Sequence, residues 1–324
     1  MRFAVLSDLH LHGWTYGSSL ISGRNSRLLD QQDVLRQFNN YCNENNIEDI
    51  LFCGDFFHQS KVSAEVLMAA HESLIELRAG KHLRFLVGNH DCQSKDNSIH
   101  ALSMLSNYGL VIDQWYTDSR YLAALPYTED KDKLSAFLSQ NLEGKIVLMH
   151  QGVSGQELNS KGFTLNEILS PDMFPDNAAF GFTGHYHSHK KVKDNLYIPG
   201  SPLQLNWSDK GEKRGWLDVD TETREVRHVE SRAPKFIECS NLEDVRGAGE
   251  NFIRFVSRSG ETANDIREAC PGARSIEVVY EKAEAQYERI ERFDTFTGLF
   301  EEFVKNKNLS DEYVRVGRKI ICAS

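Results

Sequence analysis

The stretch FAVLSDLH at residues 3–10 joins an apolar run to two residues that can bind a metal ion, Asp8 and His10. A run of four such apolar residues is typical of a short buried strand, and the polar residues that follow it mark the strand's carboxyl end. Four further apolar runs end in the same way. They are followed by GDFFH at residues 54–58, GNHD at 88–91, His150, and GHYH at 184–187. Each cluster alone is a weak signal, because such residues are common in turns.

Helix-like segments at Leu28–Cys42 and Val62–Leu77 separate the first three runs, with apolar residues at helical spacing. This alternation predicts an α/β fold. Because ligand sites in open α/β sheets form beyond the carboxyl ends of strands, we expect the five clusters to meet in one crevice. Period-two alternation over residues 215–229 predicts an antiparallel hairpin, and a domain boundary follows near Pro234.

The clusters contain two carboxylates, one asparagine amide and four imidazoles as candidate metal ligands. These hard and borderline donors suit Mn²⁺, Zn²⁺ or iron better than Ca²⁺. With one bridging carboxylate, they suffice for two ions. The candidate ligands are Asp8, His10, Asp55, Asn89, His150, His185 and His187.

Together the motifs resemble the calcineurin-like metallophosphoesterases, and within them the Mre11/SbcD nucleases; the compact length is closest to phage recombination-nuclease subunits. The resemblance covers about residues 1–230 and, more loosely, the downstream chain. It implies a metallophosphoesterase sandwich, with two mixed sheets flanked by helices, a small α/β capping domain and C-terminal helices. The implied parts are a nuclease domain at 1–232, a capping, DNA-binding domain at 233–284 and a helical partner-binding segment at 285–324.

The resemblance also implies how the ligands divide between two divalent ions. Mn²⁺ is the expected metal and Mg²⁺ the alternative. His90 would stabilise the transition state or protonate the leaving oxygen, and Asp91 would orient His90. One ion would be held by Asp8, His10, Asp55 and His187, and the other by Asp55, Asn89, His150 and His185, with Asp55 as the bridge.

Four further side chains are candidate substrate contacts. His58 replaces an aspartate that many superfamily members have, and Ser201 lies in the segment IPGSP, which resembles the nuclease branch. His189 and Lys190 lie in a predicted loop with three lysines, whose alternative role is an ordinary solvated surface. Because the formal net charge is −10, DNA binding must rest on such local patches, on metal ions or on a partner.

These features predict a Mn²⁺-dependent DNA exonuclease or endonuclease that hydrolyses phosphodiester bonds with two metal ions, in DNA recombination, repair or replication. Two alternatives stay open. One is a small-molecule or nucleotide phosphoesterase of the same superfamily, because its members share this chemistry. The other is a non-catalytic DNA-end scaffold, against which the complete ligand set and His90 argue.

The C-terminal segment predicts a protein partner. In the resembling nucleases, C-terminal helices bind the coiled coil of a Rad50/SbcC-type SMC ATPase, so we expect that partner here; packing on its own domain is the alternative. The resemblance also allows a homodimer. The segment's apolar stripe at helical spacing consists of Phe293, Phe296, Leu299, Phe300 and Phe303.

The cysteines and the apolar runs of the sequence bear on where in the cell the protein is located. The six cysteines are widely spaced and form no Cys-x-x-Cys pair, which favours reduced thiols. No apolar run has membrane length, and the N-terminal run is too short for a signal peptide. We therefore expect a cytoplasmic protein without a membrane partner, from a prokaryote or a phage-infected cell.

Overall fold

A computed structural model describes residues 1–156, 166–258, 260–280 and 304. The chain divides into two compact units, Met1–Val279 and Tyr280–Ser324. The first unit contains all the candidate ligands. Apart from Val304, the predicted C-terminal helices at 285–324 and their aromatic stripe lie outside the described residues.

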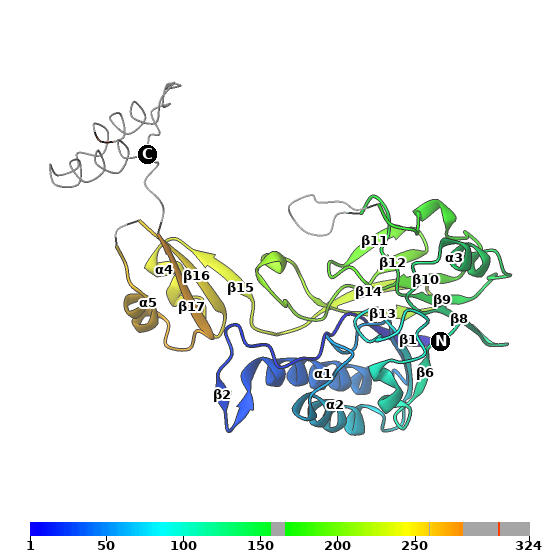
Figure 1. The fold of residues 1–324 in the computed structure, drawn as a ribbon, viewed down its shortest axis with the longest axis horizontal. Coiled ribbons are helices and arrows are strands. Elements are labelled where there is room, and N and C mark those ends of the chain that lie inside the picture. Colours follow the sequence, from blue (N-terminus) through cyan, green and yellow to red (C-terminus); the bar gives the residue numbers. More distant parts are fainter. Residues whose placement is uncertain (157–165, 259, 281–303, 305–324) are drawn as a thin grey trace, which may run out of the picture. The chain divides into compact units, whose positions relative to one another are not determined.

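The first unit is built around two six-stranded mixed sheets (Figure 1). One sheet has the strand order β14-β13-β1-β4-β5-β6. Strands β1, β4, β5 and β6 run parallel, and the predicted hairpin β13–β14 adds antiparallel strands at one edge. The strands are β1 (Arg2–Leu6), β4 (Asp49–Phe52), β5 (His82–Leu86), β6 (Leu110–Ile112), β13 (Gly215–Asp220) and β14 (Glu225–Glu230).

The other sheet has the strand order β11-β12-β10-β9-β8-β7. Its four inner strands are parallel, and an antiparallel strand closes each edge. The sequence did not predict the inner strand β8, which is fully buried. The strands are β7 (Tyr116–Thr117), β8 (Leu122–Leu125), β9 (Ile146–Met149), β10 (Phe180–Thr183), β11 (Lys190–Lys193) and β12 (Leu196–Ile198).

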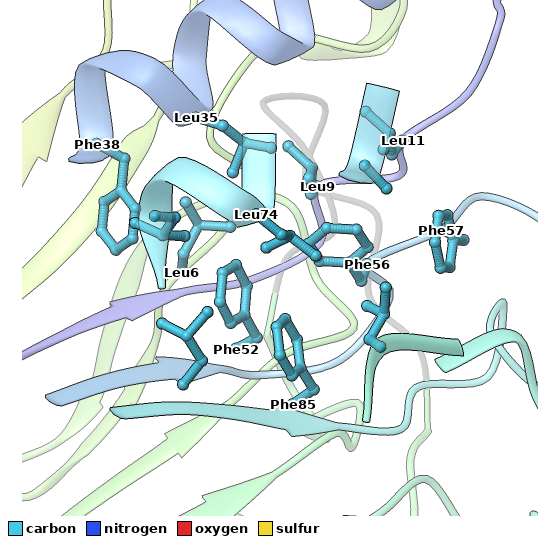
Figure 2. Packing of buried hydrophobic residues seen from close by; sticks show 14 of the residues in the cluster. Leu6, Leu9, Leu11, Leu35, Phe38, Phe52, Phe56, Phe57, Leu74 and Phe85 are labelled. Carbon is cyan, nitrogen blue, oxygen red and sulfur yellow. The ribbon is translucent and has the colours of Figure 1, made fainter. Parts of the chain in front are cut away.

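Alternate residues of β1 face different layers of the sandwich. Phe3 and Val5 pack into the core between the two sheets. Ala4 and Leu6 pack on the opposite face, in the core beneath α1 and α2 that Figure 2 shows. Helix α3 packs in a third core on the outer face of the other sheet. These layers confirm the predicted α/β sandwich of two mixed sheets flanked by helices.

The helices start at polar caps. Asn25 accepts hydrogen bonds from the backbone N–H groups at the start of α1, and Ser63 does the same for α2. A small hairpin, β2 (Leu20–Ile21) and β3 (Arg24–Asn25), leads directly into α1. Among the described helices, none combines the length and the apolar character needed to cross a bilayer. The long helices are α1 (Ser26–Glu44), α2 (Ala64–Leu77) and α3 (Lys131–Leu138).

After Pro234 the chain forms a small α/β part, residues 236–279, which we call the capping subdomain. It has its own apolar core and a three-stranded sheet in the order β15-β16-β17. The sequence predicted β16, α5 and β17 but not β15 and α4, which are only four and five residues long. The elements are β15 (Phe236–Cys239), α4 (Leu242–Arg246), β16 (Phe252–Ser257), α5 (Ala263–Ala269) and β17 (Ser275–Tyr280).

Candidate metal centre

The five motif loops leave the carboxyl ends of strands in both sheets. Because parallel strands of one sheet end at the same edge, their loops meet there. The structure therefore gathers the predicted clusters at one end of the sandwich. Asp8 follows β1, Asp55 follows β4, Asn89 follows β5, His150 follows β9, and His185 follows β10.

Four of the candidate ligands have a strained backbone. Positive φ angles are rare outside glycine and cost about 1–3 kcal/mol each. Their concentration at one place points to function, because other parts of the fold must compensate for the strain. The φ angles are 50° at Asp8, 48° at His10, 50° at Asp55 and 89° at His185.

His10 and His187 point ring nitrogens at each other, with 3.0 Å between the two Nε2 atoms. Asp8 joins them, so that one donor atom from each residue lies within 4.8 Å of the others. Two imidazole nitrogens and a carboxylate oxygen that converge in this way form a suitable ligand group for one divalent cation.

A second group surrounds Asn89, whose Oδ1 lies 3.1 Å from His150 Nε2 and 3.0 Å from His185 Nδ1. Asp55 lies between the two groups. Its Oδ2 is 3.2 Å from His150 Nε2 and 3.7 Å from His10 Nε2. The structure thus brings all seven candidates together, with Asp55 between the two groups as a bridge would be. Their role as ligands stays a prediction.

Hydrogen bonds between motifs hold these donors in place. His150 Nδ1 donates to the carbonyl of Cys53 at 2.7 Å, which makes Nε2 the nitrogen that faces a metal. Asp8 accepts a hydrogen bond from the backbone N–H of His185 at 3.0 Å. The backbone of one motif thereby orients a donor of another.

Charge states fit metal binding at most of these groups, whereas at His150 the neighbouring Asp55 outweighs burial and raises the pKa to about 9, so a cation would have to displace a proton there. Burial raises the pKa of Asp8 to about 7, whereas at Asp55 the neighbouring histidines, His150 first, outweigh burial and hold the pKa below its usual range. Burial lowers the pKa of His185 to about 4 and lowers that of His187 as well. Neutral imidazoles bind divalent cations, and a bound cation would favour the ionised form of the buried carboxylates.

Two glycines permit the close approach of the loops. Gly54 has a φ angle of 91°, and a Cβ there would collide with the His150 ring. A Cβ at Gly184 would collide with the carbonyl oxygen of Cys53. Any larger residue at either position would push the motifs apart.

His90 is oriented by a backbone group. Its Nδ1 lies 2.9 Å from the carbonyl oxygen of His58, to which it donates. Asp91 is fully buried and accepts hydrogen bonds from the backbone N–H groups of Phe57 at 2.9 Å and Gly88 at 3.0 Å. Asp91 thus joins two motif loops, while the His58 carbonyl holds the ring; an orienting role of Asp91 toward His90 stays a prediction.

His58 itself lies in the site. Its ring stacks on that of His90, with centroids 5.1 Å apart and an angle of 21° between the planes. His10, His58 and His90 also form a third group that could hold a metal ion. Burial lowers the pKa of His58 to about 4, which favours a neutral ring. Contact of His58 with substrate stays a prediction.

The other three predicted substrate contacts differ from His58 in their surroundings. Ser201 is buried, and its Oγ donates to the carbonyl of Leu203 at 3.0 Å, so this hydroxyl does not face a substrate; the prediction for it is corrected. His189 is half-buried and stacks on His228, with ring centroids 4.4 Å apart. Lys190 is also half-buried, at the start of β11. Substrate contact at His189 and Lys190 stays a prediction.

The predicted lysine loop is an edge strand, β11, whose side chains form ion pairs. Lys191 pairs with Asp194 at 3.0 Å, and Lys193 pairs with Asp176 at 2.6 Å. These carboxylates would compete with a phosphate for the same ammonium groups. The predicted cationic patch is therefore weaker than the sequence suggested.

Sequence reasoning missed Gln31, which holds the first motif loop. Its Nε2 donates to the carbonyls of Leu9 at 2.9 Å and His10 at 2.7 Å, and its Oε1 accepts from the N–H of His12 at 3.0 Å. The sequence did contain a signal for this role: Gln31 is a polar residue on the apolar stripe of the predicted helix, three residues after Leu28.

Sequence reasoning also missed Tyr127, which follows the unpredicted strand β8. Its ring stacks on His185, with centroids 5.8 Å apart and an angle of 22° between the planes. Without β8, nothing in the sequence placed this tyrosine at the same edge as the motifs.

Comparison with known proteins agrees with this geometry. The sequence profile described as calcineurin-like phosphoesterase matches residues 1–232. The DNA double-strand break repair protein Mre11 of Methanopyrus kandleri is 24% identical over 66% of this chain, and the match spans only 51% of that protein. The SbcD subunit of the nuclease SbcCD from Bacillus subtilis is 24% identical over 87% of this chain and 88% of its own length.

Solved structures are more distant. An archaeal phosphodiesterase superposes with a TM-score of 0.37 at 14% identity, covering 71% of this chain and all of that one. Pseudomonas putida nuclease MPE gives a TM-score of 0.32 at 12% identity, covering 69% of this chain and 86% of that one. The family assignment therefore rests on the sequence match, which spans most of the chain and contains every candidate ligand. The chain belongs to the calcineurin-like phosphoesterase family, whose members are metal-dependent hydrolases with a dinuclear metal centre.

Proposed function

We propose that the chain is a metal-dependent DNA nuclease and the catalytic subunit of a complex with a Rad50/SbcC-type ATPase. The observation that carries the phosphodiesterase chemistry is the convergence of two donor groups on Asp55, with the His90 ring 4.8 Å from that of His10. DNA as the substrate is supported by the two relatives, one named as a DNA double-strand break repair protein and the other as part of a nuclease.

Each part of the site has a role in this proposal. When bound, two divalent ions supply Lewis-acid activation of the phosphodiester and of water; Mn²⁺ is the proposed metal, with Mg²⁺ as the alternative. Because His90 Nδ1 is held by the His58 carbonyl, Nε2 is the nitrogen that can reach a phosphate oxygen. From there His90 stabilises the transition state or protonates the leaving oxygen.

The capping subdomain supports a polymeric substrate. The Tyr16 hydroxyl, in the loop that follows His10, donates to Glu277 of the capping subdomain at 3.2 Å. The subdomain thus extends the surface next to the first motif. A substrate with several phosphates on either side of the scissile bond can use that surface, whereas a small ester cannot.

A parallel substrate assay tests the proposal. The purified chain is incubated with Mn²⁺, Mg²⁺ or a chelator, with single-stranded and linear duplex DNA, nucleotides, and bis(p-nitrophenyl) phosphate. We expect Mn²⁺-dependent DNA cleavage that the chelator and Asp55→Asn both abolish.

Two results would contradict the proposal. Hydrolysis of nucleotides and bis(p-nitrophenyl) phosphate without DNA cleavage would make the protein a small-molecule phosphoesterase. Metal and DNA binding without hydrolysis of any substrate would make it a DNA-end scaffold.

A further inference from the structure

One short loop, residues 11–19, contacts both the candidate metal centre and the capping subdomain. Near the metal centre, the Trp14 ring packs on His58, with centroids 4.3 Å apart. Near the capping subdomain, the Tyr16 ring stacks on Phe236, with centroids 6.5 Å apart. A displacement of the capping subdomain would therefore act on the same loop that packs against the site.

A buried cation lies behind this loop. Arg27, in the first turn of α1, is only 2% exposed. Its guanidinium carbon lies 4.7 Å from the centre of the Phe252 ring, 5.5 Å from that of Phe236 and 5.9 Å from that of Trp14. Guanidinium groups are attracted to ring faces at such distances. Arg27 thus joins two rings of the capping sheet to one ring of the loop.

Hydrogen bonds fix the guanidinium in this position. Nη1 donates to the carbonyl of Tyr16 at 3.0 Å, and Nη2 donates to the carbonyl of Leu205 at 2.8 Å. Burial lowers the pKa of Arg27 to about 10, so the group stays charged at neutral pH. Burying a charge is expensive, and an apolar side chain would often stabilise a core equally well. The buried charge of Arg27 therefore indicates a role beyond packing.

The contacts form a continuous series from the capping sheet to the catalytic histidine. Phe252 contacts Arg27, Arg27 contacts Trp14, Trp14 packs on His58, and His58 stacks on His90. The contact between His58 and His90 also includes a hydrogen bond, in which the His58 carbonyl accepts from His90 Nδ1 at 2.9 Å.

We propose that Arg27 is a positioning residue that couples the capping subdomain to His90 through Trp14 and His58. The inference rests on the proposed phosphodiesterase function and deepens it. In this view the capping subdomain does more than contact DNA: its contact with Arg27 keeps the His58 carbonyl where it orients His90. Hydrolysis of even a minimal phosphodiester then depends on the capping sheet.

Kinetics with bis(p-nitrophenyl) phosphate test the coupling, because this substrate is too small to need the capping surface. Phe252→Leu and Arg27→Lys should each lower kcat about 10- to 100-fold with KM nearly unchanged, as expected when a reacting group is misplaced. The matched control is Phe255→Leu. Phe255 lies on the same strand, β16, but packs in the capping subdomain's own core and is not a member of the contact series, so its loss should leave kcat unchanged.

A spectroscopic measurement tests the same coupling without activity. The protein is labelled with 5-fluorotryptophan, and the ¹⁹F resonance of Trp14 is assigned with Trp14→Phe. We expect Phe252→Leu to shift the Trp14 resonance and to leave that of Trp115 in place, because Trp115 packs on Phe137 in a different core.

The outcomes separate clearly. A normal kcat in both Phe252→Leu and Arg27→Lys, an unshifted Trp14 resonance, or an equal fall of kcat in Phe255→Leu would each overturn the coupling. If the wild-type chain hydrolyses no phosphodiester, the proposed function fails. The shift of the Trp14 resonance in Phe252→Leu then decides alone whether the capping sheet acts on the loop.

Discussion

Single backbone carbonyls orient two histidines of the candidate metal centre in the same way. The Cys53 carbonyl accepts from Nδ1 of His150, and the His58 carbonyl accepts from Nδ1 of His90. Each bond leaves Nε2 as the functional nitrogen. The two rings differ in what lies next to that nitrogen: His150 Nε2 is 3.2 Å from Asp55, whereas His90 is placed against other histidines. Their expected roles, ligand and transition-state contact, follow from this difference.

The first prediction separates these roles by substitution. His90→Ala should reduce phosphodiester hydrolysis by about 10²- to 10⁴-fold, because a group that acts on the transition state is lost. Its metal content should stay intact. Asp55→Ala should instead lose bound metal, because Asp55 lies between both ligand groups. Metal analysis and rate measurements on the two folded variants check this. Equal metal loss in both would make His90 a ligand.

Residue types at strand ends were predictable from the sequence, but their hydrogen bonds were not. Asp8 and Asp55 could be placed because each directly follows an apolar run. The roles of Asp91 and Ser201 could not be derived in the same way. Asp91 bonds to the backbone of Phe57, which belongs to another motif, and that approach depends on the paths of two loops in the folded chain.

At the scale of elements, helix α1 stabilises the first motif loop through Gln31. Gln31→Leu keeps the size of the side chain but leaves two carbonyls and one N–H without their partner. We expect a loss of about 2–4 kcal/mol in the free energy of unfolding, measured by urea denaturation. Gln32→Leu is the matched control, because Gln32 bonds to Ala69 and Glu72 at a part-buried position. An equal loss in both variants would show that Gln31 has no special role.

The antiparallel edge β13–β14 predicts a pH dependence of stability. Burial alone would raise the pKa of Asp218, but hydrogen bonds from Arg2, Tyr41 and Arg227 lower it to about 2. A lowered carboxyl pKa stabilises the fold above the usual carboxyl pKa of about 4, and this contribution disappears as the pH falls toward 2.

The corresponding variant is Asp218→Asn. Because Arg2 and Arg227 are partly exposed, we expect a loss of only about 1–2 kcal/mol near neutral pH. The difference from the wild type should shrink on acidification to about pH 3, as followed by urea denaturation at each pH. A difference that stays constant with pH would mean that the carboxylate charge is not what stabilises this edge.

Elements were predictable where a pattern was long enough to show its period. Helix α1 repeats its apolar stripe over several turns, and its predicted range, 28–42, lies within the observed Ser26–Glu44. Strand β8 has the sequence LAAL, whose residues favour helices when considered alone. It is a strand because it pairs with β9 in parallel, and such pairing between distant segments is not visible locally.

At the scale of the whole molecule, the proposed partner contact and the proposed chemistry lie in different parts of the chain. All candidate ligands come before residue 188, whereas the aromatic stripe lies after Glu291. Deleting the residues after Glu291 should therefore leave metal-dependent hydrolysis of short single-stranded DNA largely intact. The deletion should remove ATP-stimulated degradation of duplex DNA by disconnecting the ATPase, which an assay with the reconstituted complex measures. Aggregation or loss of basal hydrolysis would mean that the segment packs on its own chain.

The central claim is that the chain holds a dinuclear metal centre, and anomalous diffraction from crystals soaked in Mn²⁺ tests it most directly. We expect two peaks, one beside Asp8, His10 and His187 and the other beside Asn89, His150 and His185, with Asp55 in contact with both. A single peak away from Asp55, or peaks that leave either group without metal, would contradict this claim.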